Sequence, residues 1–479
     1  MKILSIETSC DETAISIIEA EIKTEFKAES CKPRPFFKVL GNALYSQAET
    51  HADFGGVFPT LAKREHIVNF TPILISALKD AGMLKEKLRT VNIEETNTAG
   101  ANTAEAVEAI EPEKESPKKF LENALSFLSE REQDMHDQLL DFLLKYETPK
   151  IDAIAVTVGP GLEPALWVGI NGAKGLAYIW QIPIIPTNHM EGHIMSVLID
   201  DEKPVSPVGP ASQNDNVIVE TKDEIHFPAV ALLISGGHTE LVQVNSWGDY
   251  KLLGQTRDDA VGEAFDKVAR IIGLKYPGGP KISALAKRFR EGEFDAEHST
   301  ASIAWDFPRP MITKKDCDFS FSGIKTSVLY AVRDNSKKDA DGKQIELSEA
   351  DKASLCAEFE QAVTDVLISK TRRALEESEA KTLIIGGGVS ANTFIKESFV
   401  KMIADEFTFE NPTGDAIQNQ SVTLLVPQKH LSTDNSLMIG IAGFLRYSSG
   451  HFIAKIDKKH LEWNQEESPE LRANGNLGL

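Results

Sequence analysis

The sequence predicts an α/β protein made of two related lobes, and two observations lead to this fold class. Residues Lys2 to Ala20, KILSIETSCDETAISIIEA, have the pattern of a strand, a tight polar turn and a second strand. The same pattern returns from Ala229 to Asn245, AVALLISGGHTELVQVN. A strand–turn–strand unit used twice, roughly 230 residues apart, is typical of a duplicated core.

Two glycine turns strengthen this interpretation. TLIIGGGVSANTF (382–394) and IAVTVGPGLEPALWVGINGAKGLA (154–177) each run from an apolar strand through glycines into a helix. Backbone N–H groups in such turns can face an anion, because glycine has no Cβ to block its approach. Two hairpins and glycine turns at helix starts resemble the actin-like ATPase (ASKHA) superfamily, in which each lobe contributes one phosphate-facing hairpin.

We expect three domains along the chain. Residues 1–228 form the N-terminal lobe, residues 229–430 form the C-terminal lobe, and residues 431–479 form a return helix and a tail on the N-terminal lobe. The polar segment 85–147 has the composition of an insertion. Its second part, 120–146, has apolar residues at helical spacing, so that helix either packs on the first lobe or docks a partner. We expect the end of the tail to be mobile.

Composition limits the partners and the compartment. The 479 residues include 51 Lys and Arg against 72 Asp and Glu, which gives a formal charge of −21. The average surface therefore repels phosphate backbones, and a nucleic-acid substrate would need a local basic patch or a partner protein. The four cysteines form no C-x-x-C pair, and no apolar run approaches the roughly 20 residues of a membrane span. We expect a cytoplasmic protein with reduced thiols and no membrane contact.

The strongest chemical motif is HMEGH, which places His189 and His193 four residues apart on one helical face. In zinc peptidases of the H-E-x-x-H type the glutamate directly follows the first histidine. Here Met190 takes that place, and Glu191 lies roughly 200° around the helix from His189. The pair therefore favours a metal site without the peptidase base. The alternative is that the two histidines share no function and their spacing is incidental.

Asp434 is a candidate third ligand. It lies in the polar turn STDNS before a long apolar helix pattern, so its carboxylate can sit at the helix N-terminus. The alternative is that Thr433 or Asp434 is simply the N-cap of that helix, a common role for both residue types.

Other candidates are weaker. Asp266, in the helix pattern AFDKVARII, could bind a ligand hydroxyl or could pair with Lys267 or Arg270. Gly279 in PGGP would allow a ligand close to the backbone or would only form the turn. Scattered histidines around HADFGGVFPTLAKREH, such as His66, are expected to be structural.

Taken together, these segments resemble one family closely. The sequence is similar to the TsaD family of tRNA adenosine threonylcarbamoyltransferases, formerly described as O-sialoglycoprotein endopeptidases. The matching blocks appear in the family's order and are ILSIETSCDETAISI, GGVFPTLAKREH, GPGLEPALWVGINGAKGLA, NHMEGHI, LLISGGHTEL, DDAVGEAFDKVARIIGLKYPGGP, DFSFSGIKTSV, GGGVSANTF and TDNSLMIGIAG.

The resemblance implies roles for individual residues. His189, His193 and Asp434 match the family's metal ligands, and Asp11 and Glu12 match acidic residues that face the active cleft. The residues that match substrate-binding positions are Leu233, Ile234, Ser235, Gly236, Gly237, Asp266, Gly279 and Asn392. Two positions depart from the family: Thr60 replaces a usual glutamate, and Leu233 replaces a tyrosine that serves some relatives as a further ligand.

The resemblance also implies a function. The expected reaction transfers a threonylcarbamoyl group from threonylcarbamoyl-AMP to N6 of the adenosine next to the anticodon in tRNAs reading codons that begin with A. The expected cofactor is one divalent metal per subunit, iron(II) in preference to zinc. Expected partners are tRNA, a degenerate paralogue, a small ATPase and a separate enzyme that makes the adenylate. The first alternative is an ATP-regulated actin-like binding or chaperone protein, and the second, which the sequence favours less, is a metallopeptidase.

Overall fold

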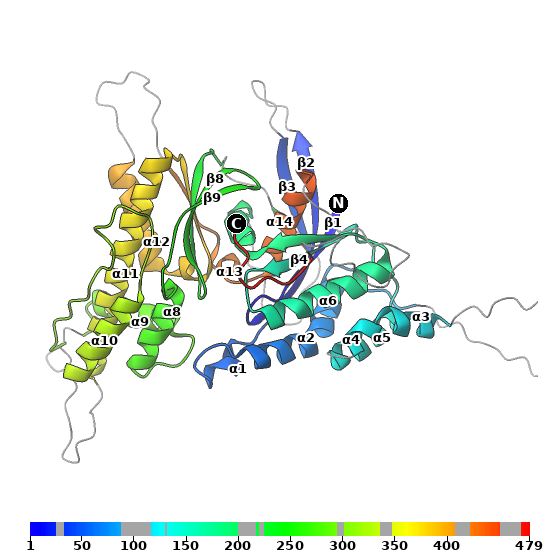
Figure 1. Ribbon diagram of the computed structural model, residues 1–479, viewed down its shortest axis with the longest axis horizontal. Coiled ribbons are helices and arrows are strands. Elements are labelled where there is room, and N and C mark those ends of the chain that lie inside the picture. Colours follow the sequence, from blue (N-terminus) through cyan, green and yellow to red (C-terminus); the bar gives the residue numbers. More distant parts are fainter. Residues whose placement is uncertain are drawn as a thin grey trace, which may run out of the picture.

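The computed structural model describes ten segments of the chain. They are residues 1–24, 33–87, 116–129, 132–199, 217–219, 225–294, 301–335, 347–407, 422–450 and 471–479. The predicted insertion 85–147 is therefore described only in part, because residues 88–115 lie outside these segments. Two lobes lie side by side, and each is built on one β-sheet (Figure 1).

The first lobe holds, in the described residues, a sheet with the strand order β5-β4-β1-β2-β3-β6. Its strands are β1 (Lys2–Glu7), β2 (Glu12–Thr24), β3 (Pro33–Ser46), β4 (Ala153–Gly159), β5 (Ile184–Asn188) and β6 (Val217–Val219). β1 pairs antiparallel with β2 and parallel with β4, which pairs parallel with β5. Alternate side chains of β1 enter different cores, as the two-residue repeat of a strand requires.

Helices cover both faces of this sheet. Leu4 and Ile6 belong to the core that includes α2 (Pro59–Asp80) and α6 (Glu163–Trp180), whereas Ile3 belongs to the core under α14 (Ser436–Ser448). Because both faces are buried, β4 is almost continuously apolar, and every residue of β1 after Lys2 is buried. The short helices α1 (Ala48–Ala52) and η1 (Ser196–Leu198) also belong to this half, and α13 (Lys429–Ser432) directly precedes α14.

The second lobe holds a sheet with the order β11-β10-β7-β8-β9 among the described residues. Its strands are β7 (Ala229–Ile234), β8 (Thr239–Ser246), β9 (Asp249–Gln255), β10 (Thr382–Gly386) and β11 (Thr423–Leu425). Its helices are α8 (Val261–Ile271), α9 (Gly278–Arg290), α10 (Ser322–Asn335), α11 (Glu349–Ser378), η2 (Gly388–Ala391) and α12 (Thr393–Glu406). The apolar side chains of α8, α9 and α11 share one core with β7.

The two sheets repeat one topology. In each, an antiparallel strand–turn–strand (β1–β2 or β7–β8) continues into a third antiparallel strand on one side. On the other side, two parallel strands follow, β4 and β5 or β10 and β11. This correspondence confirms the predicted two-lobed, actin-like α/β fold with a duplicated strand–turn–strand core.

The described part of the insertion packs on the first lobe. Segment 120–146 was expected to be one helix, but it forms α3 (Pro117–Ala124), α4 (Ser126–Ser129) and α5 (Gln133–Lys145). Serine hydroxyls explain part of the break, because Ser126 Oγ donates to Asn123 O at 2.8 Å and so competes with the helical ladder. The apolar face is nevertheless buried in the core with α2 and α6, which favours packing over docking of a partner.

Helix α7 (His189–Met195) lies where the two lobes meet. It contacts β5 of the first sheet and both β7 and β10 of the second. Met190 and Ile194 pack among Ala231, Leu233 and Ile384 of the second lobe. Side chains on α7 are therefore held from both sides. Within the described residues, no helix combines the length and the apolar character that a membrane crossing requires.

Candidate metal centre

Helix α7 presents His189 and His193 on one face. Asn188 caps the helix, since its side chain accepts hydrogen bonds from the N–H groups of Met190 (2.8 Å) and Glu191 (3.2 Å). The cap starts the helix at His189, and one turn later His193 follows. The two Nε2 atoms face each other at 3.1 Å, and both rings are buried.

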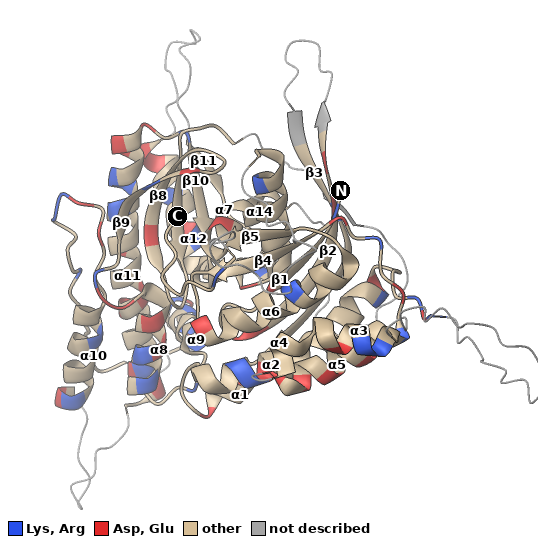
Figure 2. Ribbon diagram, turned by 45° about the vertical axis from the view of Figure 1, so that its right-hand side comes forward, with Lys and Arg blue, Asp and Glu red and all other residues tan. Residues whose placement is uncertain are grey.

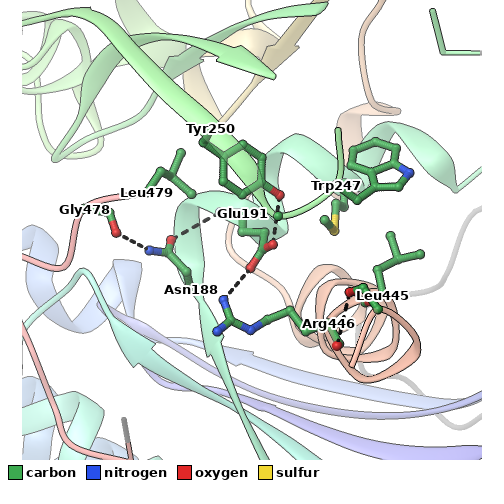
Figure 3. Close-up of a pocket in the computed structure, with 11 residues that line it drawn as sticks. Asn188, Glu191, Trp247, Tyr250, Leu445, Arg446, Gly478 and Leu479 are labelled. Atoms are coloured by element: carbon green, nitrogen blue, oxygen red, sulfur yellow. Dashed lines mark hydrogen bonds and ion pairs between the residues drawn. The ribbon is translucent and has the colours of Figure 1, made fainter. Parts of the chain in front are cut away.

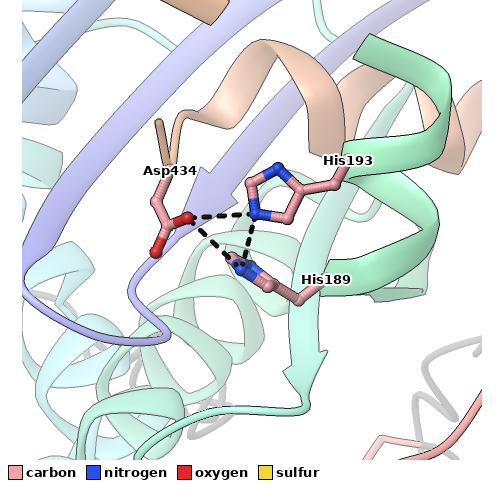
Figure 4. A group of neighbouring side chains, drawn as sticks. All are labelled: His189, His193 and Asp434. Atoms are coloured by element: carbon pink, nitrogen blue, oxygen red, sulfur yellow. Dashed lines mark hydrogen bonds and ion pairs between the residues drawn. The ribbon is translucent and has the colours of Figure 1, made fainter. Parts of the chain in front are cut away.

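Asp434 completes the group from the turn between α13 and α14. The expectation that Thr433 or Asp434 caps α14 is wrong, because Asn435 is the cap and accepts from Met438 N at 3.0 Å. The carboxylate of Asp434 is therefore free of the capping role and faces the two histidines. Its Oδ1 lies 3.1 Å from His193 Nε2 and 3.4 Å from His189 Nε2 (Figure 4).

The three side chains fit a divalent metal ion. Two nitrogens that bind one zinc tetrahedrally, at about 2.0–2.1 Å each, lie roughly 3.4 Å from each other. The separations of 3.1–3.4 Å among Nε2 of His189, Nε2 of His193 and Asp434 Oδ1 are close to that value. Two imidazoles and one carboxylate suit iron or zinc and leave coordination positions open.

Glu7 at the end of β1 orients His189. Glu7 is fully buried, and its Oε2 lies 3.1 Å from His189 Nδ1 while accepting from Thr157 Oγ1 at 2.6 Å. A hydrogen bond from Nδ1–H to a carboxylate turns Nε2 and its lone pair toward Asp434, an arrangement common behind metal-binding histidines. Glu7 was not predicted from the sequence, because no local pattern in β1 marks it as a partner of His189.

The charged side chains of this group shift one another's pKa values. Burial opposes the charged form of His189, but Asp434 and Glu7 overcome it and hold the pKa of that imidazole well above its usual range. Burial would likewise raise the pKa of Asp434, yet His189 and His193 hold it well below its ordinary value. For His193 burial prevails, and its pKa is lowered. The carboxylate is therefore ready as an anionic ligand.

Glu191 takes no part in this group. It is buried on another side of α7, where it accepts from Tyr250 Oη at 2.8 Å and from Arg446 Nη1 at 3.2 Å (Figure 3). The same residues line a cavity of about 210 Å³ with Asn188 and Leu479. A carboxylate held by a tyrosine and an arginine cannot act as a peptidase base at His189, which argues against the metallopeptidase alternative.

The first hairpin brings Asp11 and Glu12 toward the group. Asp11 lies in the turn between β1 and β2, and Glu12 is the first residue of β2. Gln47 N donates to Asp11 O at 2.9 Å, and Ser46 Oγ donates to Glu12 Oε1 at 3.2 Å. Burial raises the pKa of Glu12 well above its usual range, and the nearby charges of Asp11 and Asp434 raise it further. Ser9 Oγ in the same turn lies 3.2 Å from His189 Nδ1, which places the hairpin beside the metal ligands.

His66 holds this hairpin turn. It is buried in α2, with Nδ1 2.7 Å from Thr13 Oγ1 and Nε2 3.1 Å from Cys10 O. Since a carbonyl only accepts, Nε2 carries the proton and Nδ1 accepts from Thr13. Burial lowers the pKa of His66 to about 4, so the ring is neutral near pH 7.

The second hairpin turn runs from Ser235 to His238. Leu233 and Ile234 precede it with fully buried side chains, so these two residues can meet a substrate only through their backbone. Ser235 Oγ already accepts from Gly237 N (3.3 Å) and His238 N (3.0 Å). An anion would have to compete with that hydroxyl for these two N–H groups. Gly236 and Gly237 have open space where a Cβ would stand.

Asp266 and Gly279 lie together at the start of α9. Asp266 Oδ1 accepts from Gly278 N at 2.7 Å, so its carboxylate already caps the helix. A Cβ on Gly278 would lie 2.4 Å from Ala269 Cβ, whereas at Gly279 it would meet only Phe265 Cβ at 3.9 Å. Gly278 is thus required by packing, and Gly279 faces space that a ligand could use.

Asn392 is tied into the second lobe. Its Oδ1 caps α12 by accepting from Ile395 N at 3.1 Å, and its Nδ2 donates to Ser283 Oγ (2.8 Å) and Glu360 Oε1 (2.7 Å). Asn392 reaches α9 through Ser283, and Asp266 reaches it through Gly278. The structure therefore places Asp266, Gly279 and Asn392 around α9 in the second lobe and the metal ligands at the lobe junction.

Comparisons with known proteins found one family model and several solved structures. The family model TsaD, described as tRNA N6-adenosine threonylcarbamoyltransferase, matches residues 38–95, 128–223 and 214–441. The solved structure of full-length HypF in the phosphate- and nucleotide-bound form is similar at a TM-score of 0.38 and 11% identity, over 67% of this chain and 43% of that one. The structure of T. kodakarensis HypF gives a TM-score of 0.37 and 12% identity, over 66% of this chain and 43% of that one.

The chain spans less than half the length of either HypF structure, and a likeness at these scores does not bear on function. The family match is different, because it covers more than half of the chain and includes His189, His193, Asp434, Asp266 and Asn392. The blocks recognised in the sequence, the duplicated two-lobed fold and this match agree. The chain belongs to the TsaD family of tRNA N6-adenosine threonylcarbamoyltransferases.

Proposed function

We propose that the chain transfers the threonylcarbamoyl group from threonylcarbamoyl-AMP to N6 of the adenosine next to the anticodon, in tRNAs that read codons beginning with A. One observation supports this proposal most: His189, His193 and Asp434 converge at the junction of the lobes, where Ser9 Oγ of the first hairpin lies 3.2 Å from His189 Nδ1. Membership of the TsaD family connects that arrangement to a tRNA adenosine.

The reaction is an acyl transfer. A bond forms between N6 of the adenosine and the carbonyl carbon of the donor, and the bond from that carbon to the phosphate oxygen breaks. AMP leaves with the electron pair, and N6 loses one proton. An exocyclic adenine amine is a weak nucleophile, so both the removal of the proton and the charge developing on the donor need help from the protein.

Glu12, or its neighbour Asp11, accepts the N6 proton in this proposal. A general base works best when its pKa lies near the working pH. The pKa of Glu12 is raised by its burial and by the charges of Asp11 and Asp434, in the direction that a base of this kind requires. Ser46 donates to Glu12 and fixes the position of the carboxylate.

His189, His193 and Asp434 would hold one divalent metal ion per subunit, iron(II) in preference to zinc. A bound ion of this kind supplies Lewis-acid stabilisation of the negative charge that develops on the donor. Glu7 fixes the ring of His189, and the caps Asn188 and Asn435 fix the two segments that carry the ligands.

The second lobe binds the donor in this proposal. The backbone from Leu233 to Gly237 contacts the donor, and Gly279 leaves room for its adenylate part. Asp266 and Asn392 adjoin that space, although both side chains already bond within the lobe. In this proposal the two side chains have two roles: they hold the starts of α9 and α12 in place, and they contact the donor.

The acceptor and partner proposals rest on charge. The chain carries −21, and Figure 2 shows acidic and basic residues interspersed on α3, α8 and α10. A surface of this kind holds an RNA backbone weakly. We therefore infer that tRNA binding relies on partners, which would be a degenerate paralogue and a small ATPase, with a separate enzyme that makes the adenylate. The proposed compartment is the cytoplasm.

A single assay tests the function. The purified chain, with candidate partners, is incubated with labelled threonine, bicarbonate, ATP and unmodified tRNA, and the RNA is scored for modified adenosine. We expect label on the adenosine next to the anticodon, loss of the label when His189 and His193 are both changed to Ala, and retention in the control His226→Ala. An ATP-regulated binding protein would close its lobes on nucleotide without labelling RNA, which would refute the proposal.

A further inference from the structure

Two phenylalanines stand out on the surface of the first lobe. Phe54 and Phe58, in the turn between α1 and α2, are 62% and 52% exposed and are the most exposed large apolar side chains of the described residues. Their rings stack on each other, with centroids 6.0 Å apart and an interplanar angle of 20°. Aromatic rings kept together in solvent indicate a binding surface, because packing does not explain them.

Buried hydrogen bonds hold the turn that carries the two rings. Gly55 and Gly56, with φ of +69° and +152°, let the chain reverse. Phe58 N donates to Nδ1 of the buried His51 at 3.4 Å, and His51 in turn bonds to Gln47 at 3.0 Å. The backbone N–H of Gln47 donates to Asp11 O. The ring pair is therefore joined by a short chain of hydrogen bonds to the hairpin that carries the proposed base.

The second lobe meets this turn. Arg270 on α8 donates from Nη2 to Gly55 O. Arg270 lies one helical turn after Asp266, which adjoins the proposed donor site. The turn between α1 and α2 thus faces α8 of the second lobe, on the side where the two lobes meet (Figure 1).

The chemistry of the place favours a nucleobase as the occupant. Asp11 and Glu12 on the hairpin, and Asp266 on α8, are acidic groups on the two elements joined to this turn, and they repel phosphates. The face of a base is neutral and stacks on an aromatic ring whatever the charge nearby. Two rings form a patch far smaller than the roughly 800 Å² per partner of a stable protein interface. A patch of this size suits a base that is not paired, as in the loop of a folded RNA.

We propose that Phe54 and Phe58 stack an unpaired base of the acceptor RNA, next to the adenosine that enters between the lobes. This inference rests on the proposed function for its substrate. Stacking on the two rings would hold the loop in place where the acidic hairpin offers no attraction for the backbone. The guanidinium of Arg270 borders the same turn and would close the platform on the side of the second lobe.

The test uses a short RNA stem–loop with 2-aminopurine beside the acceptor adenosine, and the full-length chain together with the candidate partners of the transfer assay. Binding to the wild type should quench the 2-aminopurine fluorescence. The double variants Phe54→Ala/Phe58→Ala and Phe54→Leu/Phe58→Leu should bind at least about tenfold more weakly and quench little, within the range for a lost base–aromatic stack. Phe54→Tyr/Phe58→Tyr, which keeps the rings, should restore both. Phe120→Ala removes another exposed ring, from α3, and serves as the control.

The leucine variant decides between stacking and plain apolar contact, since leucine keeps the bulk and removes the aromatic face. In the transfer assay the loss should fall on the KM for the RNA and not on kcat. Wild-type affinity and quenching in the leucine variant would overturn the inference. So would alanine variants that lose a protein partner from the complex but keep RNA binding. If the wild type labels no RNA at all, the proposed function fails, while the quenching still decides the stacking.

Discussion

Glu7 offers a strong test of how the site is held together. Glu7→Gln keeps the shape of the side chain but replaces one carboxylate oxygen with an NH2 group. In the structure both oxygens face donors: Ser9 N at 2.5 Å on Oε1, and Thr157 Oγ1 and His189 Nδ1 on Oε2. Whichever way the amide turns, its NH2 group meets a donor.

The expected cost has two parts. Loss of the carboxylate behind a metal-binding histidine typically weakens metal affinity by about 10- to 100-fold, which equals roughly 1.4–2.8 kcal/mol. The unsatisfied buried donor should lower the free energy of unfolding by a further 1–3 kcal/mol or so. Glu7 is fully buried, so solvent cannot replace the lost acceptor.

Metal affinity is measured by competition with a chelator of known strength, and stability by denaturant unfolding. Asp351→Asn is the matched control, because Asp351 is also a buried carboxylate that accepts several hydrogen bonds (Ser302 N at 2.7 Å) but lies in the second lobe. It should lower stability and leave metal affinity unchanged. Metal affinity at the wild-type level in Glu7→Gln would refute the role of Glu7.

The remaining predictions concern the base, a histidine, two glycines and the acceptor. Glu12→Gln should lower kcat while donor binding persists, and unchanged turnover would remove Glu12 from its role. The pKa of His66 falls from 6.5 to about 4 on folding, so its contribution to the free energy of unfolding is complete above pH 6.5 and decreases by roughly 3 kcal/mol as the pH falls toward 4. The free energy of unfolding, measured against pH, should therefore decrease less in His66→Gln than in the wild type. Equal decreases in the two proteins would contradict this. Gly278→Ala should reduce the Tm through its clash with Ala269, whereas Gly279→Ala should leave the Tm unchanged and raise the KM for the donor; the reverse order would be evidence against this assignment. The isolated chain should bind tRNA weakly with a steep dependence on salt, and tight binding at physiological salt would argue against a need for partners.

The fold could be predicted from the sequence because the signals were local and repeated. The two strand–turn–strand units carry their own turn chemistry, and the family blocks occur in order along the chain. Segment 120–146 shows the limit of periodicity, since three short helices that pack on one core keep the spacing of a single helix. The mobile end expected for the tail differs from the structure, where Asn474 N donates to Val158 O at 2.9 Å.

Some residues of the site could be predicted from the sequence and others could not, and the reasons are physical. His189 and His193 share one helix turn, so their spacing was visible in the sequence. Asp434 was ambiguous because three polar residues precede α14, and only the structure identifies Asn435 as the cap. Glu7 could not be recognised, since its partners lie far away in the sequence and meet only when β1, β4 and α7 come together.

The central claim is that His189, His193 and Asp434 hold one metal ion on which the transfer depends. The most direct measurement is the rate of threonylcarbamoyl transfer in protein stripped of metal and refilled stepwise, with the bound metal counted at each step. The rate should rise in proportion to bound metal up to one equivalent, and Asp434→Ala should neither retain the ion nor recover the rate. Full activity in the stripped protein would contradict the claim.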